Sequence, residues 1–270
     1  MTTWVSAVQR LRRDRRPGVL VTVTEVRGHG PRDAGAKMVV SGSEVWGTIG
    51  GGNLEETALD HAKHMLDALP VEPSSITVSL NDKARTAHGR QCCGGEVALL
   101  FEPLPVVPSI AIFGMGHVGL ELARILARHD LDLHLVDSRS TYLGADRLAC
   151  LDDGPAQVVA HHSPVPELAL GEVPGGTHVL ILTHDHAEDF ALCDAALRTS
   201  HLGSIGLIGS AAKWRRFQQG LRVEGHAESA IARIQSPIGT PDIGGKDPAM
   251  IAHSVAAQLL RTVRVGVAPS

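Results

Sequence analysis

The sequence predicts an α/β protein whose C-terminal half is a parallel-sheet domain and whose N-terminal half is a smaller α/β domain. In the second half, short aliphatic runs alternate with helical stretches, the order that gives parallel strands joined by right-handed crossovers. A glycine-rich loop follows the first of these runs. Aromatic residues make up only 3% of the 270 residues, so aliphatic side chains must form the core, as in a parallel sheet covered by helices.

The first half contains the elements of a small mixed domain. Apolar residues at helical spacing predict a short helix from Trp4 to Leu11, and runs rich in Val, Ile and Thr predict strands. The expected strands are 18–26, 37–40, 44–47, 76–80 and 96–101, with a longer helix from 54 to about 69. Three prolines between 103 and 108 interrupt the pattern, so we place a boundary there, between domains 1–105 and 106–270.

The second half alternates regularly between strand and helix. The expected strands are 109–113, 131–136, 158–160, 178–182 and 203–208. Helices are expected over 117–128 and 187–199, through Trp214 and Phe217, and over 248–261. This alternation predicts a Rossmann-type sheet with parallel strands.

Composition excludes several function classes. The net charge of −4 offers no basic footprint for nucleic acid, and no apolar stretch reaches the roughly 20 residues that a membrane helix needs. The N-terminus has no basic segment leading into an apolar run, so no secretory signal is expected. Four cysteines are too few for a disulfide framework in a chain of this length. We therefore expect a soluble cytoplasmic protein with reduced thiols.

The strongest motif is the loop Gly114-Met-Gly116-His117-Val-Gly119 between a strand and a helix. The first glycine permits a tight turn, the second lets a phosphate approach the backbone, and the third lets the helix pack on the strand. Asp137 ends the next strand, where an acidic residue binds ribose hydroxyls in dinucleotide enzymes. The motif predicts an anion site with His117 facing the ligand. The alternative is a tight turn that serves only the fold.

A second motif, His184-Asp185-His186, follows the fourth strand of this half, at the edge where open α/β sheets bind ligands. Two histidines around an aspartate are able to bind a ligand or a metal. The alternative is that Asp185 or His186 caps the next helix and the histidines form only local hydrogen bonds.

The third motif is Cys92-Cys93-Gly-Gly. A thiolate beside glycine N–H groups and near Arg90 would have a lowered pKa, and it would suit nucleophilic attack or a soft metal. Both cysteines are therefore candidate metal ligands. The alternative is two small buried residues at the start of a strand.

Two further glycine segments lie in the first half. Gly50-Gly51-Gly52 precedes a helix and predicts a second anion cradle, but it lacks the Lys-Ser/Thr of a P-loop, so nucleotide hydrolysis is not indicated. The loop over 28–35 carries Arg32, which is a candidate partner for an oxyanion. A plain turn is the alternative there.

Taken together, these segments resemble the xanthine dehydrogenase accessory proteins of the XdhC/CoxF type. The resemblance covers nearly the whole chain and rests on EVRGHGPRDAGAKM, GTIGGGNLE, CCGGEVALLFEPL, FGMGHVG, VDSR, THDHAED, IGLIGSAAKWRRF and SPIG…DIGGKDPAMIAHSVAAQL. Many relatives have a single cysteine before Gly-Gly, which aligns best with Cys93. The additional Cys92 leaves open which thiol acts.

The resemblance implies a molybdenum-cofactor chaperone, an accessory or maturation factor rather than a turnover enzyme. Such a protein binds molybdopterin, plain or as the cytidine dinucleotide, and protects it while a cysteine desulfurase or other sulfurtransferase installs the sulfido ligand. It then delivers the cofactor to apo-xanthine dehydrogenase or a related molybdenum hydroxylase. The resemblance also implies an N-terminal XdhC/CoxI-type domain, a C-terminal Rossmann domain and a possible homodimer.

Two rival functions follow from the motifs. An NAD(P)-dependent oxidoreductase is favoured by the glycine loop and Asp137, but no Lys-His or Tyr-Lys pair stands beside the loop in the sequence. A metal-dependent hydrolase would use the His-Asp-His segment, but the sequence contains no second cluster with metal-ligand spacing.

Overall fold

The computed structural model describes residues 3–69, 72–80 and 94–265. The chain divides after Val106 into two compact units, the second of which runs from Val107 to Val263. The division falls one residue beyond the boundary expected from the prolines. Each unit has a sheet and a hydrophobic core of its own.

The first unit contains a five-stranded antiparallel sheet in the order β3-β2-β1-β5-β4. Its strands are β1 (Gly18–Arg27), β2 (Lys37–Ser41), β3 (Glu44–Gly47), β4 (Ser74–Ser79) and β5 (Glu96–Leu104). Its helices are α1 (Trp4–Arg13) and α2 (Gly52–Asp67). All seven elements follow the expected ranges to within a few residues.

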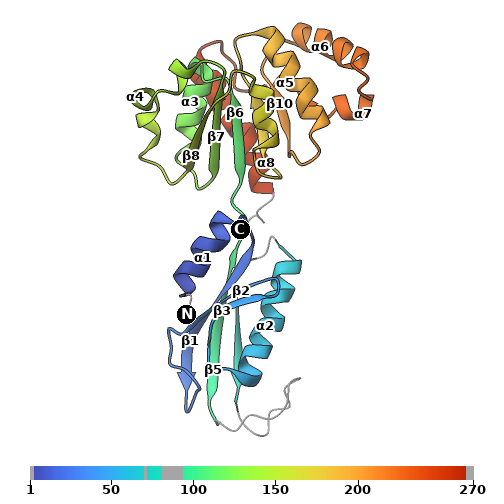
Figure 1. Ribbon diagram of the computed structural model, residues 1–270. Coiled ribbons are helices and arrows are strands. Elements are labelled where there is room, and N and C mark those ends of the chain that lie inside the picture. The colour runs from blue at the N-terminus through green and yellow to red at the C-terminus, as the bar shows by residue number, and fades with distance from the viewer. Residues whose placement is uncertain (1–2, 70–71, 81–93, 266–270) are drawn as a thin grey trace. The chain divides into compact units, whose positions relative to one another are not determined.

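The side chains of β1 alternate between the two faces of this sheet, and a helix packs on each face. Val19, Val21 and Val23 pack in one core with α2, whereas Leu20 packs with α1 on the other face. Because successive side chains of a strand point to opposite faces, β1 alone specifies both layers. Figure 1 shows α1 and α2 on either side of the strands.

The second unit contains six parallel strands in the order β11-β10-β9-β6-β7-β8. They are β6 (Ser109–Phe113), β7 (Asp132–Asp137), β8 (Gln157–His162), β9 (His178–Ile181), β10 (Ile205–Leu207) and β11 (Ile234–Gln235). The order reverses between β6 and β9, which is the topological switch point of a Rossmann sheet. The predicted α/β class with a Rossmann-type sheet is confirmed.

Helices cover both faces of this sheet (Figure 1). One core contains side chains of α5 (His186–Arg198), α6 (Ala211–Val223) and α7 (Glu228–Ile231), and the other contains those of α3 (His117–Leu126) and α8 (Pro248–Val265). The short elements α4 (Ala145–Leu148), η1 (Ser140–Leu143), η2 (Ala149–Leu151) and η3 (Pro166–Gly171) complete the unit. Within the described ranges, no helix combines the length and apolarity needed to cross a membrane.

Candidate functional site

The glycine loop between β6 and α3 lies at the carboxyl edge of the parallel sheet, and its glycines meet different surroundings. Gly114 has a φ of +104°, and a Cβ there would lie 2.6 Å from the carbonyl oxygen of Leu182. A Cβ on Gly119 would lie 2.0 Å from the carbonyl oxygen of Gly114. A Cβ on Gly116 would meet no heavy atom within 4 Å. Gly114 and Gly119 therefore serve close backbone packing, whereas Gly116 leaves open space beside the loop.

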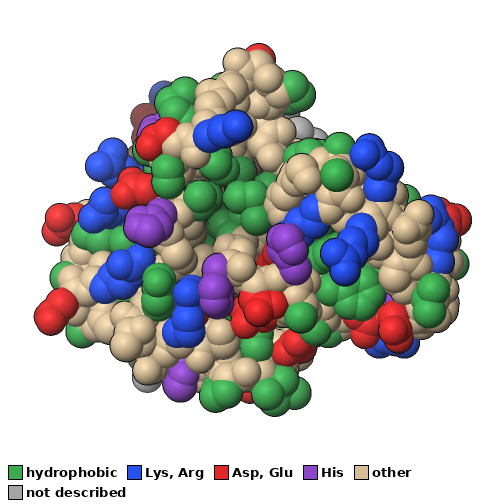
Figure 2. Space-filling model, turned by 90° about the horizontal axis from the view of Figure 1, so that it is seen from above, with side chains coloured by type: hydrophobic (Ala, Val, Ile, Leu, Met, Phe, Trp, Pro, Cys, Tyr) green, Lys and Arg blue, Asp and Glu red, His purple; other side chains and the backbone are tan. Residues whose placement is uncertain are grey.

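The first turn of α3 presents backbone N–H groups at this loop. The helix begins at His117, and its N-cap, Gly116, has no side chain to accept hydrogen bonds from that turn. The side chain of Met115 is buried beneath the loop, while His117 is exposed. Uncapped N–H groups and the positive end of the helix dipole favour an anion such as a phosphate. On this face of the unit, histidine, acidic and basic side chains surround a recessed apolar area (Figure 2).

Asp137 ends β7 beside the loop and is only 2% exposed. Its Oδ2 accepts hydrogen bonds from the N–H of Met115 (2.7 Å) and from Nη2 of Arg139 (3.0 Å). Its Oδ1 accepts from the backbone N–H and from Nε of Arg139, both at 2.9 Å. Burial acts to raise the pKa of Asp137, but the hydrogen bonds from Arg139 and Met115 outweigh it and hold the pKa below its ordinary value of 3.8. The carboxylate is therefore engaged within its own chain.

Two residues that the sequence did not single out, Tyr142 and Arg147, complete this corner. The guanidinium carbon of Arg139 lies 3.7 Å from the ring centroid of Tyr142, and that of Arg147 lies 5.0 Å from it. Nη2 of Arg147 donates to the carbonyl oxygen of Met115 at 3.0 Å. Two arginines within ten positions of Asp137 were the available signal, but only the folded segment after β7 brings them to the glycine loop.

The His184-Asp185-His186 segment begins α5. Asp185 is the N-cap, and its Oδ1 accepts from the N–H groups of Ala187 (2.6 Å) and Glu188 (3.2 Å), as the capping alternative predicted. Both histidines are exposed. Across the part of the chain that the structure describes, no group of three or more His, Cys, Asp or Glu side chains is arranged to hold a metal ion.

The start of α5 also meets the end of β7. Ser138 Oγ donates to Oε2 of Glu188 at 2.9 Å, which brings the second motif alongside the glycine-loop corner. Burial raises the pKa of Glu188, and the nearby charge of Asp137 adds to the rise.

A buried ion pair fixes the carboxyl ends of β9 and β10. Asp189, which is 1% exposed, pairs with Lys213 and accepts from the N–H and the hydroxyl of Thr183 at 3.1 and 2.6 Å. Lys213 also donates to the carbonyl oxygen of Ile208 at 3.1 Å. The pair therefore holds the loop that carries the two histidines.

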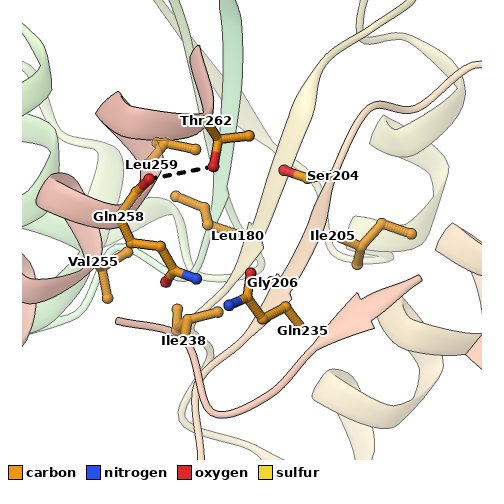
Figure 3. Close-up of a pocket in the computed structure, with 10 residues that line it drawn as sticks. All are labelled: Leu180, Ser204, Ile205, Gly206, Gln235, Ile238, Val255, Gln258, Leu259 and Thr262. Carbon is orange, nitrogen blue, oxygen red and sulfur yellow. Dashed lines mark hydrogen bonds between the residues drawn. The ribbon is translucent and has the colours of Figure 1, made fainter. Parts of the chain in front are cut away.

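Two cavities of the second unit differ greatly in size. One of about 570 Å³ lies between α5 and α6, and His186, Ala187, Phe190, Lys213, Arg216, Phe217 and Gly220 line it. The other, under α8 beside β10, has a volume of about 20 Å³, which is room for about one water molecule. Figure 3 shows that Gln235, Gln258 and Thr262 are among the polar side chains around the smaller cavity.

In the first unit, three glycine segments that are distant in sequence meet at one end of the sheet. A Cβ on Gly50 would lie 2.4 Å from Cγ of Pro31. A Cβ on Gly95 would lie 2.2 Å from the carbonyl oxygen of His29, and one on Gly28 would lie 3.3 Å from Cα of Gly95. The loop over 28–35, the triple glycine and the glycines after Cys92-Cys93 are therefore packed together.

The triple-glycine loop holds a carboxylate from its own helix. Gly50, Gly51 and Gly52 all have positive φ angles, and Gly51 is the N-cap of α2. Oε1 of Glu55 accepts from the N–H groups of Ile49 (3.0 Å) and Gly50 (3.2 Å), and from the Thr48 hydroxyl. Burial acts to raise the pKa of Glu55, but the Thr48 hydroxyl and the backbone N–H groups outweigh it and hold the pKa below 4.5.

Three further residues of this unit were predicted to bind a ligand: Arg32, Cys92 and Cys93. The side chain of Arg32 is exposed. Cys92 and Cys93 lie outside the described residues, so their proposed role stays a prediction. The N–H of Gly94 donates to the carbonyl oxygen of Leu80 at 3.0 Å, which ties the chain after the cysteines to the end of β4.

Comparisons with known proteins relate both halves of the chain to one family. A family model described as the XdhC Rossmann domain matches residues 110–259, and one described as the XdhC and CoxI family matches residues 11–71. An uncharacterized protein, YqeB of Escherichia coli K12, is 25% identical over 91% of this chain and 43% of its own length. A probable xanthine dehydrogenase subunit of Bacillus subtilis is 27% identical over 57% of this chain and 43% of its own.

A solved structure described as a xanthine dehydrogenase from Bacillus halodurans is 18% identical and covers 97% of this chain and 96% of that chain, with a TM-score of 0.49. The chain thus spans less than half the length of the two curated relatives. The Rossmann-domain model alone covers more than half of the chain, from the strand before the glycine loop to the last helix. With both family models matched in order along its length, the chain belongs to the XdhC family.

Proposed function

We propose that this protein binds the molybdenum cofactor and serves in the maturation of a xanthine dehydrogenase or a related molybdenum hydroxylase. The observation that carries the proposal is the open space at Gly116 beside the uncapped first turn of α3, which suits an anion, in a chain of the XdhC family. The B. subtilis relative, a probable xanthine dehydrogenase subunit, supports the choice of client.

Two anion sites were expected, and the contacts distinguish them. The triple-glycine loop already holds the carboxylate of Glu55. At α3, no such side chain caps the helix, and the space beside Gly116 is open. These contacts favour the α3 loop, where the helix supplies N–H donors, as the proposed site for a phosphate of the cofactor.

The metal end of the cofactor needs a soft ligand. A thiolate suits molybdenum better than an oxygen donor does, so Cys93 or Cys92 is proposed as the ligand. A sulfurtransferase that installs the sulfido ligand and the apo-hydroxylase are the proposed partners, and a homodimer is the proposed assembly.

Release to a client requires moderate affinity: a micromolar Kd corresponds to about 8 kcal/mol, whereas a picomolar Kd, about 16 kcal/mol, would retain the cofactor.

Retention of the cofactor in gel filtration tests the proposal. The purified protein is incubated with molybdenum cofactor and passed through the column, and pterin fluorescence and molybdenum are measured in the protein peak. We expect both to co-elute, with a loss in Gly116→Val, whose side chain would fill the phosphate space. Gly171→Val is the matched control, because Gly171 is exposed and a Cβ there would also meet no heavy atom within 4 Å.

The same experiment tests the thiols and the whole proposal. Cys92→Ala and Cys93→Ala are compared separately, and unchanged molybdenum retention in both would remove the thiol assignment. Absence of both pterin and molybdenum from the wild-type peak at micromolar protein would contradict cofactor binding itself.

A second candidate, an NAD(P)-binding oxidoreductase, is favoured by the strand order and the glycine loop. It requires turnover of the nicotinamide as well as binding. Consumption of NADH or NADPH by the purified protein, in the presence of an oxidised substrate, would favour this candidate. Binding without consumption would leave the maturation role as the better account.

A further inference from the structure

We propose that the corner after β7 recognises a phosphate on the ribose of a bound nucleotide, so that the Rossmann unit prefers nucleotides of the NADP type to those of the NAD type. This goes beyond cofactor delivery, because the nucleotide would bind at the α3 loop in place of the cofactor phosphate. It rests only on described residues of the second unit. The corner consists of Asp137, Arg139, Tyr142 and Arg147 beside the glycine loop.

Asp137 stands where an acceptor would select a ribose hydroxyl. An acidic residue at the end of the second strand normally accepts from the ribose 2′-hydroxyl in NAD-binding domains. Here the two oxygens of Asp137 accept four hydrogen bonds, one from Met115 and three from Arg139. A carboxylate offers about four acceptor sites, so Asp137 has none left for a ribose.

Asp137 holds the guanidinium group of Arg139 in place. Two of the five N–H groups of its guanidinium donate to Asp137, and one face of the group lies over Tyr142. The other three N–H groups have no hydrogen-bond partner among the described residues, and 29% of the side chain is exposed. Arg139 is thus a fixed cation with donors to spare.

Arg147 is a second arginine at this corner. Its Nη2 donates to the carbonyl oxygen of Met115, which anchors the guanidinium to the glycine loop. Its Nε is buried and has no partner among the described residues. A buried donor without a partner costs stability unless a ligand supplies the acceptor. Arg147 therefore adds a second cation with an unsatisfied donor at the same corner.

The balance of donors and acceptors then selects the ligand. Two guanidinium groups offer donors, while the acceptor expected for a hydroxyl is saturated. A further carboxylate near Arg139 is that of Glu188, whose Oε2 already accepts from Ser138. A phosphate brings acceptors and two negative charges, and it pairs with guanidinium groups better than a hydroxyl does.

Competitive fluorescence titration tests the preference. The whole protein is titrated with NADPH and with NADH, and the bound NADPH is then displaced with 2′,5′-ADP or with 5′-AMP. We expect NADPH to bind at least about tenfold more tightly than NADH, the effect of about one charge-assisted hydrogen bond. We expect 2′,5′-ADP to displace it at correspondingly lower concentration than 5′-AMP.

Variants locate the effect. Arg147→Gln is expected to weaken NADPH about tenfold and to change NADH less than about twofold, because only the phosphate loses a partner. Arg128→Gln, an exposed arginine just beyond the other end of α3, is the control and should change neither. Thermal unfolding of each variant identifies any loss caused by misfolding.

Several results would overturn the inference. Equal affinities for the two dinucleotides, a preference for NADH, or no binding of either at millimolar concentration would each do so. No molybdenum cofactor is present in these titrations, so such a failure is separate from a failure of cofactor retention in gel filtration.

Discussion

At the scale of single residues, the glycines of the α3 loop separate packing from ligand binding. We expect Gly119→Ala to lower the free energy of unfolding by about 2 kcal/mol, because its Cβ would meet the backbone carbonyl of Gly114. Gly116→Ala should lower it by less than about 1 kcal/mol, because the new methyl group enters open space and only the preference of the N-cap for glycine over alanine is lost. Urea unfolding of both variants measures the difference, and equal losses would contradict the division of roles.

The buried carboxylate of Asp137 should make the stability of the protein depend on pH. Its folded pKa lies below the ordinary 3.8, so its stabilisation is fully present above that value and is lost as the pH falls through the folded pKa. We expect Asp137→Asn to lower the free energy of unfolding by about 2 kcal/mol at pH 7, since Arg139 loses a charged partner. The difference from wild type should shrink at pH values below 3.8, and a pH-independent difference would contradict the assignment.

At the scale of elements, the start of α2 is an anion site filled by its own helix. Glu55→Ala leaves the N–H groups of Ile49 and Gly50 without their acceptor, and we expect a loss of about 2 kcal/mol. Added phosphate should recover part of this loss by entering the vacated loop. Chemical unfolding with and without phosphate measures both effects, with the exposed Glu72→Ala as control. No recovery by phosphate would contradict the loop's affinity for anions.

The elements also show what the sequence was able to predict. The strands with clear aliphatic runs, such as β6 and β9, were predicted nearly to the residue. A parallel strand that is buried on both faces consists almost entirely of aliphatic residues, which makes its bounds visible in the sequence. β11 was missed because it is only two residues long, Ile234–Gln235, and it forms by pairing with β10. A pairing of that kind depends on tertiary contact and leaves no periodic signal.

The candidate site was predictable to a similar degree. The glycine loop and Asp137 follow a pattern with fixed spacing, so the sequence alone indicates them as candidates. The contacts of Arg139 with Asp137 and of Arg147 with Met115 were not predictable. They depend on the path of the backbone over residues 138–148, and the sequence of that segment has no recurring pattern. Glu55 was missed as the occupant of the triple-glycine loop because it stands one position beyond that of a capping-box glutamate.

At the scale of the whole molecule, two separate cores predict local responses to mutation. Glu55→Ala should raise hydrogen exchange in strands and helices of the first unit and leave the parallel sheet of the second unchanged. Gly119→Ala should do the reverse. Mass-spectrometric hydrogen exchange measures both, and exchange that rises throughout the chain in either variant would contradict independent cores.

A role in maturing a molybdenum hydroxylase requires transfer of the cofactor to the apo-enzyme. Protein loaded with molybdenum cofactor is mixed with purified apo-xanthine dehydrogenase, and the molybdenum gained by the enzyme and its xanthine-oxidising activity are measured. We expect the enzyme to gain molybdenum and activity faster and more completely than from free cofactor at the same concentration, and to gain less from Gly116→Val. No more molybdenum or activity than free cofactor gives would contradict it.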